Sequence, residues 1–210
     1  MALSIVVLAA GQGTRMKSDL PKVLQPMAGR PLLAHVLDRC QELAADAVHV
    51  VYGHGGEKVK QEFAGHSVNW VLQAQQLGTG HAVQQAAPHI PADHNVLVLC
   101  ADVPLIKTKT LKRLLAELES HPLSLLTVDM SDPTGYGRII RSSDGAVQAI
   151  VEHRDANAEL RAVKEINTGL LAARADKLAG WLNGLRADND QQEYYLTDIV
   201  ALAVAGGDGV

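Results

Sequence analysis

Aromatic residues are scarce in this sequence of 210 residues: phenylalanine, tryptophan and tyrosine together make up 3%. A surface that stacks nucleic-acid bases on aromatic rings is therefore not expected, and the core must be built from aliphatic side chains. The sequence also lacks any cluster of lysine or arginine, and its formal net charge is −4. These features predict that the partners include neither nucleic acid nor a membrane surface.

Cysteine is equally sparse, with Cys40 and Cys100 in no metal-like spacing. Two buried thiols in a reducing compartment are the simplest interpretation. Long hydrophobic runs are lacking too, since the apolar start over residues 2–10 is too short to span a bilayer and has no basic leader. We therefore expect a cytoplasmic globular protein, in keeping with 47% hydrophobic and 20% charged residues.

Apolar, strand-like runs alternate with amphipathic helical segments through the first part of the chain. Strands are expected at 3–9, 47–52, 69–73, 96–100 and 123–128, and helices at 31–43, 58–63, 79–87 and 108–119. This alternation predicts an α/β fold: a Rossmann-like, mostly parallel sheet with helices on both faces. Thr79 is expected to cap the third helix through its side chain.

The pattern changes after Asp132, where two short strand-like segments flank the turn sequence SSDG. The later part predicts a hairpin of strands at 137–141 and 146–152, a strand at 166–173, and helices at 157–163, 175–186 and 197–205. We therefore expect one domain over residues 1–210, with a nucleotide-binding half of about 1–130 and a second half of about 131–210. The hairpin would form one wall of a pocket for a second substrate.

A glycine-rich turn, LAAGQGTRM, follows the first strand. Gly11 and Gly13 permit close backbone approach to an anion, and Arg15 and Lys22 supply cations suited to phosphate. The turn is neither a Walker loop nor a dinucleotide fingerprint. The simpler alternative is a tight turn with two solvated cations. The prolines around Lys22, in LPKVLQP, favour binding, because they are expected to present this side chain on a stiff, extended backbone.

Two further segments end strands at the same expected edge of the sheet. Gln73 and Gly78, in QAQQLGTG, offer an amide that pairs with a base edge and a glycine that permits close approach, although a capped helix entry is the simpler alternative. Asp102 follows the most strand-like run and suits Mg²⁺ bound by one or two carboxylates plus substrate phosphates. Cys100 is a poor nucleophile candidate, because it ends a buried strand without a base partner.

The second half offers polar groups but no metal pattern. Glu152 and Asn167 lie on the expected hairpin and strand segments, and on spacing alone each is better explained as a surface polar group. The segment around Thr197 and Asp198 is interpreted as packing at the start of a helix rather than as chemistry. Nine histidines scatter across expected loops without HxxxH spacing in a convincing helix, so most are expected to be solvated.

An ordered set of motifs runs through the whole chain. It comprises LAAGQGTRM, LPKVL, QLGTGHAV, ADVPL, DPTGYGRI, IVEH, EINTG and EYYLTDI. In this order the motifs resemble the bacterial N-acetylglucosamine-1-phosphate uridyltransferases, the N-terminal half of a bifunctional enzyme that makes UDP-N-acetylglucosamine. The resemblance implies Mg²⁺-dependent transfer of UMP from UTP to N-acetylglucosamine 1-phosphate, with release of pyrophosphate, for peptidoglycan and lipopolysaccharide synthesis.

The resemblance also implies roles for individual residues. Arg15, Lys22 and Asp102 would be catalytic, and Asp102 would bind the metal. The uracil would be held by Gln73, Gly78 and Thr79, and the amino sugar by Gly137, Glu152 and Asn167. The full nucleotide-binding set would be Leu8, Ala9, Ala10, Gly11, Gly13, Lys22, Gln73, Gly78, Thr79, Cys100, Ala101 and Asp102.

The sequence departs from this family at Cys100-Ala101, where tyrosine-glycine is usual. The family also has a second magnesium ligand, an asparagine in a GVNN-like segment, and a left-handed β-helix domain that carries acetyltransferase activity and forms a trimer. We expect the natural chain to continue into these parts, and the 210 residues alone to be a monomer or weak oligomer. Two alternatives stay open: the same chemistry on another base or sugar, and a catalytically weak nucleotide-binding module.

Overall fold

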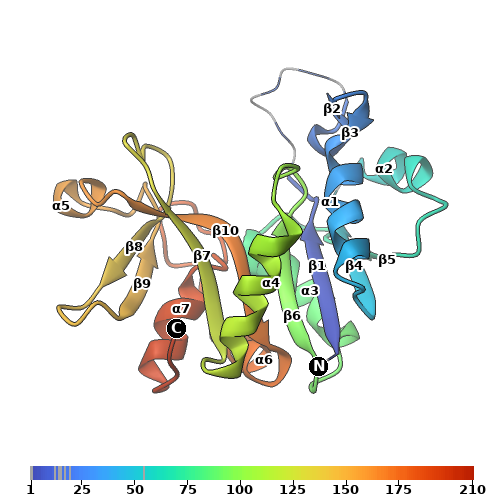
Figure 1. The fold of residues 1–210 in the computed structure, drawn as a ribbon. Coiled ribbons are helices and arrows are strands. Elements are labelled where there is room, and N and C mark those ends of the chain that lie inside the picture. The colour runs from blue at the N-terminus through green and yellow to red at the C-terminus, as the bar shows by residue number, and fades with distance from the viewer. Residues whose placement is uncertain (1, 12, 14–15, 17, 19, 54) are drawn as a thin grey trace.

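Four parallel strands form the centre of the fold, as the alternating sequence pattern predicted. The computed structural model describes residues 2–11, 13, 16, 18, 20–53 and 55–210. The strands are ordered β5-β4-β1-β6 (Figure 1) and comprise β1 (Leu3–Leu8), β4 (Ala47–Tyr52), β5 (Asn69–Leu72) and β6 (Asn95–Cys100). Val6 packs into one core and Ile5 into the other, both fully buried, so the sheet is covered on its two faces.

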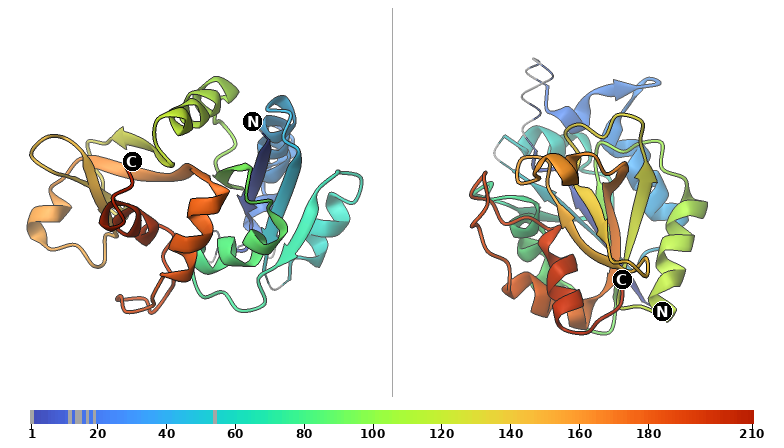
Figure 2. Two further views of the ribbon diagram at one scale, coloured as in Figure 1. Left: turned by 90° about the horizontal axis from the view of Figure 1, so that it is seen from below. Right: turned by 90° about the vertical axis from the view of Figure 1, so that its left-hand side faces the viewer.

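The helices divide between these two faces, as viewed from below in Figure 2. One face carries α1 (Leu32–Glu42), α2 (Glu57–Glu62) and α4 (Thr108–Ala116), and the other carries α3 (Thr79–Ala86), α6 (Ala175–Asn183) and α7 (Asp198–Ala205). Each helix turns an aliphatic stripe inward, so burial of apolar surface holds the three layers together. Within the described residues, none of the helices is both long and apolar enough to cross a membrane.

A late strand, β10 (Glu165–Arg174), enters the sheet beside β6 and runs antiparallel to it. Its other edge pairs with β7 (Leu123–Asp129), also antiparallel. The prediction that residues 123–128 extend the sheet by a parallel βαβ unit is therefore wrong in its pairing, although the strand itself is confirmed. The residues of β10 that pair with β6 and β7 include Ala172 and Ala173, which are fully buried, and filling this central position buries both of their faces.

The expected hairpin is confirmed as β8 (Arg138–Arg141) and β9 (Val147–Val151). It joins the main sheet through β10, where Ile166 pairs with Arg138. The elements that remain are η2 (Lys22–Leu24), β2 (Pro26–Met27), β3 (Arg30–Pro31), η3 (Ala87–His89), η4 (Glu117–Glu119) and α5 (Ala158–Arg161). The β2–β3 hairpin was not expected from the sequence.

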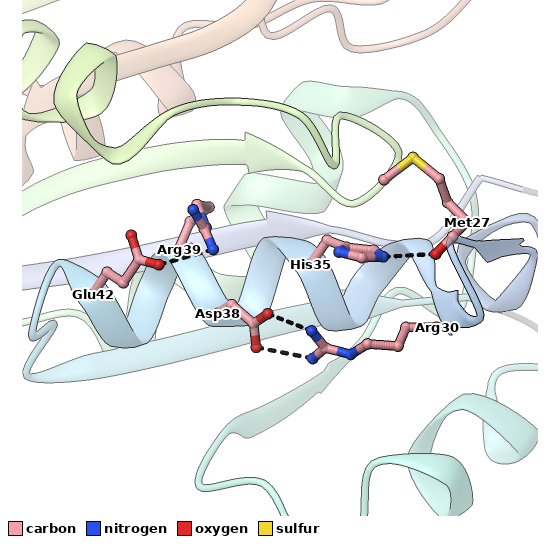
Figure 3. Close-up of polar contacts among 6 residues, drawn as sticks. All are labelled: Met27, Arg30, His35, Asp38, Arg39 and Glu42. Atoms are coloured by element: carbon pink, nitrogen blue, oxygen red, sulfur yellow. Dashed lines mark hydrogen bonds and ion pairs between the residues drawn. The ribbon is translucent and has the colours of Figure 1, made fainter.

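The β2–β3 hairpin is held against α1 by the polar contacts drawn in Figure 3. The guanidinium of Arg30 donates two hydrogen bonds to Asp38, at 2.7 and 3.0 Å. The Nε2 atom of His35 lies 2.9 Å from the carbonyl oxygen of Met27. Since this hairpin follows η2 directly, the contacts also fix the position of Lys22 relative to the sheet.

His49 is an exception to the expectation that most histidines are solvated. It sits in β4 with 1% of its surface exposed, and its ring stacks on that of His89 with the centroids 6.3 Å apart. Neither ring nitrogen has a hydrogen-bond partner among the residues that the structure describes. Burial, reinforced by the nearby His89 and His94, holds the pKa of His49 below its ordinary value.

Candidate active site

A pocket of about 420 Å³ opens at the carboxyl ends of β1 and β6, and we call it the β1–β6 pocket. In a parallel sheet this edge is the position expected for ligands. Its lining comprises Leu8, Ala9, Ala10, Gly11, Lys22, Val23, Gln73, Gln76, Gly78, Thr79, Ala82, Cys100, Asp102 and Glu193. The structure thus brings together all the expected nucleotide-binding residues except Gly13 and Ala101, which are not part of this lining. Arg15 lies outside the described residues.

A second pocket of about 250 Å³, which we call the hairpin pocket, adjoins the first and shares Leu8, Thr79 and Cys100 with it. Its lining comprises Leu8, Thr79, Cys100, Gly135, Tyr136, Gly137, Ile150, Glu152, Asn167, Thr168, Gly169, Leu171, Leu196 and Thr197. Gly137, Glu152 and Asn167, the residues expected for the amino sugar, therefore lie together in a pocket that adjoins the β1–β6 pocket.

Lys22 and Asp102 form an ion pair in the β1–β6 pocket. Their side chains are 36% and 33% exposed, so both charges remain accessible to a ligand. The sequence predicted each group separately, one for phosphate and one for metal, and did not predict that they meet. The pair joins the segment after the glycine turn to the end of β6.

The backbone around Lys22 differs from the extended segment predicted from its flanking prolines. Residues 22–24 form a single turn of 3₁₀ helix, η2, whose Val23 and Leu24 are buried. Gly13 has φ +60°, and a Cβ atom there would lie 2.6 Å from Cβ of Lys22. Only glycine permits this close approach, so the glycine turn positions the lysine as well as exposing amide groups.

Asp102 is the only predicted metal ligand in the β1–β6 pocket. Among the described residues, no group of three or more histidine, cysteine, aspartate or glutamate side chains is arranged to hold an ion. The Asp102 carboxylate at the edge of a nucleotide-sized pocket fits Mg²⁺, which usually keeps several waters and takes other ligands from substrate phosphates. The donor set therefore fits a metal that arrives with a nucleotide and does not form a metal cage.

Cys100 and Ala101 replace the tyrosine and glycine expected by resemblance. Burial raises the pKa of the Cys100 thiol to about 12, and the nearby Asp102 carboxylate adds to the increase. The thiol therefore stays protonated, in agreement with the prediction that it is no nucleophile. Ala101 is fully buried and is not among the described residues with positive φ, so replacing glycine introduces no backbone strain here.

Gln73 is 2% exposed, and its amide nitrogen is already engaged within the protein. The Nε2 atom donates to the carbonyl oxygen of Gly78 at 3.0 Å and lies 3.1 Å from Nδ1 of His81. Within the described chain, no group donates to Oε1 of Gln73. The side chain therefore offers a ligand an acceptor, whereas the sequence had predicted both a donor and an acceptor.

The segment of residues 193–197, which we call the connecting segment, lies against the start of α3. Gly78 has φ +110°, and a Cβ atom there would lie 2.6 Å from the carbonyl oxygen of Tyr194. The glycine is thus needed for contact with the connecting segment, a role that the sequence did not predict, and its approach to a base stays a prediction. Thr79 does not cap α3, because its Oγ1 accepts a hydrogen bond from the backbone of Leu196 at 3.1 Å.

Several residues of the two pockets escaped sequence reasoning. Thr197, interpreted as helix-start packing, donates from its hydroxyl to Oε1 of Glu152 at 3.1 Å. Gln76 donates to the backbone carbonyl of Ala10 and so braces the glycine turn. Its only sequence signal was its position between Gln73 and the glycine at 78. Glu193 lines the β1–β6 pocket through the fold alone, from a segment distant in sequence.

This fold, with its two adjoining pockets, is that of a nucleotidyltransferase. The family model described as "MobA-like NTP transferase domain" matches residues 5–165, and the chain belongs to this family. The match covers β1, the glycine turn, Asp102 and the β8–β9 hairpin.

Curated proteins that match nearly the whole chain are named "Bifunctional protein GlmU". That of Pseudomonas aeruginosa strain PAO1 is 59% identical over 207 residues, and that of Halorhodospira halophila is 60% identical over 205 residues. These matches cover 99% and 98% of this chain, which spans 45% and 43% of the relatives' length. The resemblance to the bifunctional uridyltransferases is thereby confirmed.

Two solved structures share the fold at low sequence identity. UDP-glucose pyrophosphorylase complexed with UDP-glucose matches with a TM-score of 0.82 at 17% identity, over 99% of this chain and 89% of that one. HddC from Yersinia pseudotuberculosis complexed with GMP-PN matches with a TM-score of 0.66 at 19% identity, over 92% and 83%. They confirm the expected mostly parallel α/β architecture.

Proposed function

We propose that this chain transfers UMP from UTP to N-acetylglucosamine 1-phosphate, giving UDP-N-acetylglucosamine and pyrophosphate. The observation that carries the proposal is the adjacency of the two pockets, one lined by Lys22, Gln73 and Asp102 and the other by Glu152 and Asn167. A nucleotidyltransferase needs two phosphorylated substrates side by side, and the shared lining residues supply that arrangement. The relatives' 59% identity supports the choice of substrates.

The proposed reaction does not require a general base. A phosphate oxygen of the sugar phosphate, already anionic at neutral pH, forms the new bond to the α-phosphorus, and the bond from that phosphorus to the bridging oxygen of pyrophosphate breaks. Catalysis then depends on alignment and on offsetting the mutual repulsion of the two anions. Lys22 and Arg15 would steady the triphosphate and the departing pyrophosphate.

Asp102 would hold Mg²⁺, which supplies positive charge to the phosphates when it is bound. The family implies a divalent metal in general, and the choice of magnesium rests on the oxygen donor at this position. Because Asp102 is paired with Lys22 in the β1–β6 pocket, the nucleotide phosphates would provide the alternative partner for the lysine.

Recognition would be divided between the pockets. Gln73 would accept a hydrogen bond from N3–H of uracil, with Gly78 and Thr79 shaping the same wall. Glu152 would accept hydrogen bonds from sugar hydroxyls, and Asn167 and Gly137 would complete the contacts with the amino sugar. In this proposal the nucleotide-binding half is about residues 1–130, and the sugar-phosphate half is about residues 131–210.

The physiological setting is also a proposal, because the chain spans less than half of its curated relatives. We propose a cytoplasmic enzyme that supplies peptidoglycan and lipopolysaccharide synthesis, with UTP and N-acetylglucosamine 1-phosphate as its small-molecule partners. Trimer formation would belong to the further domain of the family.

A pyrophosphate-release assay tests the reaction directly. With magnesium present, UTP plus N-acetylglucosamine 1-phosphate should release pyrophosphate, whereas UTP plus glucose 1-phosphate or CTP plus the amino-sugar phosphate should release far less. Equal rates for all three pairs would remove the substrate assignment and leave a general nucleotidyltransferase. Formation of UDP-N-acetylglucosamine, identified by mass, excludes hydrolysis of UTP as the source of the signal.

A further inference from the structure

The connecting segment joins the two pockets through main-chain hydrogen bonds. The N–H of Tyr194 donates to the carbonyl oxygen of Leu77 at 2.8 Å, and its own carbonyl oxygen accepts from the N–H of Gly80 at 2.7 Å. Leu196 N–H donates to Oγ1 of Thr79. These bonds hold one end of the segment against the loop that carries Gln73 and Gly78.

The other end of the segment reaches the hairpin pocket at Thr197. This threonine occupies the position before α7, where such residues usually cap the first turn through their side chain. No side-chain cap forms, and the hydroxyl donates instead to Oε1 of Glu152, 45 residues away in sequence. The side chain is buried, with 8% of the residue exposed, so water does not compete freely for this bond.

Glu152 is held between two neighbours. On one side lies the hydroxyl of Thr197, and on the other the backbone of Gly137, where a Cβ atom would lie 3.2 Å from Oε1. A hydrogen bond to Oε2 is not formed by any residue in the described ranges. One carboxylate oxygen is therefore fixed by the protein, while the other is left for a ligand in the hairpin pocket.

The charge on Glu152 depends on the same contact. Burial raises the pKa of Glu152, the hydrogen bond from Thr197 lowers it, and the nearby Asp155 raises it. Other titratable groups around this site include Tyr136, which lines the same pocket, and Tyr195, Asp188 and Asp198. Burial, followed by the charge of Glu152, raises the pKa of Asp198 to about 6. In this acidic surrounding, the Thr197 hydroxyl is a neutral donor that favours the ionised carboxylate.

We propose that Thr197 is a positioning residue for sugar recognition, which fixes Glu152 as an aimed, ionised acceptor and ties it to the base-binding loop through the connecting segment. The proposal rests on the proposed function, because it assumes that Glu152 accepts from sugar hydroxyls. Thr197 itself lies behind this carboxylate and acts through it. The β1–β6 pocket and the hairpin pocket then keep a fixed separation, which favours a nucleotide-linked sugar of matching length.

Binding of UDP-N-acetylglucosamine and of UDP, measured by calorimetry at pH 7.5, separates the sugar contacts from the nucleotide contacts. Thr197→Val should weaken UDP-N-acetylglucosamine about tenfold, the scale for removing a hydrogen bond to a charged group. Its affinity for UDP should stay within about twofold of wild type. Thr197→Ser should restore binding, and Thr197→Ala should weaken it as valine does. If Thr197→Val weakens the binding of UDP-N-acetylglucosamine and of UDP equally, Thr197 has only a structural role and the proposal is wrong.

Thr108→Val is the matched control, because Thr108 also stands at a helix start and donates to a glutamate carboxylate, that of Glu42, away from both pockets. It should leave both affinities unchanged. If Thr197→Val and Thr197→Ala both bind the sugar nucleotide as wild type does, the proposal is wrong.

The pH dependence gives a second readout that a merely structural role does not move. If Glu152 must be ionised, the KM for N-acetylglucosamine 1-phosphate rises as pH falls through the pKa of Glu152. Removing the Thr197 donor raises that pKa, so the rise in KM should begin at higher pH in Thr197→Val and return to its original position in Thr197→Ser. If the wild-type protein turns over these substrates and the Thr197 variants have the same pH profile as wild type, only the positioning role is wrong. If the wild-type protein, tested together with the expected continuation of its chain, shows no turnover of these substrates, the proposed function is wrong instead.

Discussion

Lys22 and Asp102 form an ion pair within the β1–β6 pocket, although each is suited to a different part of a magnesium nucleotide. The lysine neutralises the carboxylate when no nucleotide is present. A metal ion alone must therefore displace an internal cation, whereas a nucleotide brings phosphates that replace Asp102 as the partner of Lys22. This relationship predicts an order of loading.

We expect the nucleotide-free protein to bind Mn²⁺, used as a spectroscopic substitute for Mg²⁺, more weakly than the UTP complex does. Lys22→Met should raise the Mn²⁺ affinity of the nucleotide-free protein by up to roughly fivefold, the scale of an exposed ion pair, and weaken UTP binding. Paramagnetic resonance of free Mn²⁺ measures the metal affinity, and calorimetry measures the affinity for UTP. Lys58→Met removes the same charge from the neighbouring surface and should change neither. Unchanged metal affinity in Lys22→Met would show that the pair does not control loading.

Gln73 predicts the choice of base. Its Nε2 is engaged by Gly78 and His81, so Oε1 favours a base with an N–H at the facing position, as uracil has and cytosine lacks. In thermal denaturation with magnesium, UTP should raise the melting temperature more than CTP, GTP or ATP at equal concentration. Gln73→Ala should remove this difference, while the exposed Gln75→Ala should keep it. Equal shifts with all four nucleotides would contradict uracil selection.

Arg15 is expected to stabilise charge on the transferred phosphate, because it follows Gly13 by two positions in the glycine turn. Arg15→Ala should lower kcat by roughly 10²-fold or more, the scale for losing one charge-stabilising group, without changing the melting temperature. The exposed Arg113, on α4, supplies the control: Arg113→Ala should retain the wild-type rate. A near wild-type rate in Arg15→Ala would show that Arg15 is a solvated loop residue without a role in the reaction.

The left-handed backbone at Gly78 should be intolerant of any side chain. Gly78→Ala combines an unfavourable φ with a clash against Tyr194, so we expect a loss of about 2–4 kcal/mol in the free energy of unfolding and weaker UTP binding. Gly65 has open space around its Cα and no positive φ. Gly65→Ala should therefore change stability by less than about 1 kcal/mol. Urea denaturation measures both, and equal effects would contradict the assigned contact.

His49 predicts a loss of stability in acid. Its native pKa is lowered, so below the unfolded-state value of about 6.5 the unfolded chain binds more protons than the native one. The contribution of His49 is complete above that pH and declines as the pH falls through it toward the lower native value. Asp198 acts in the opposite direction, since its pKa is raised. The difference in urea midpoint between wild type and His49→Leu, followed from pH 8 to 5, isolates the histidine, and a constant difference would contradict its burial as a neutral group.

Much of the fold could be predicted because the relevant signals are local. The run from Leu3 to Leu8 is apolar at every position but one, as a strand covered on both faces requires, and nearly every helix lies within the predicted range. The insertion of β10 between β6 and β7 could not be predicted. Strand pairing depends on which edge buries most surface, and residues 165–174 give no local sign of their neighbours.

The same distinction applies to the site. Gln73 and Asp102 follow strand ends and Lys22 follows the glycine turn, so their placement at one edge of the sheet could be predicted, whereas the ion pair between Lys22 and Asp102 could not. Thr79 was assigned to a local helix cap and Thr197 to packing at a helix start, yet the hydroxyls of both bond to groups far away in sequence. A local pattern indicates that a hydroxyl needs a partner, and only the tertiary structure decides which partner it has.

The register shift in the pairing of β10 with β7 bears on how the two halves of the chain can move. The strand pairs with β6 through Leu171 and beyond, and after a register shift it carries Asn167 into the hairpin pocket. The groups expected to hold the sugar are therefore continuous, through backbone hydrogen bonds, with the sheet that holds the nucleotide. Rotation of one half against the other would have to distort the pairing of that strand. We therefore expect substrate capture to come from loops of the chain, while the shared sheet fixes the distance between the two pockets.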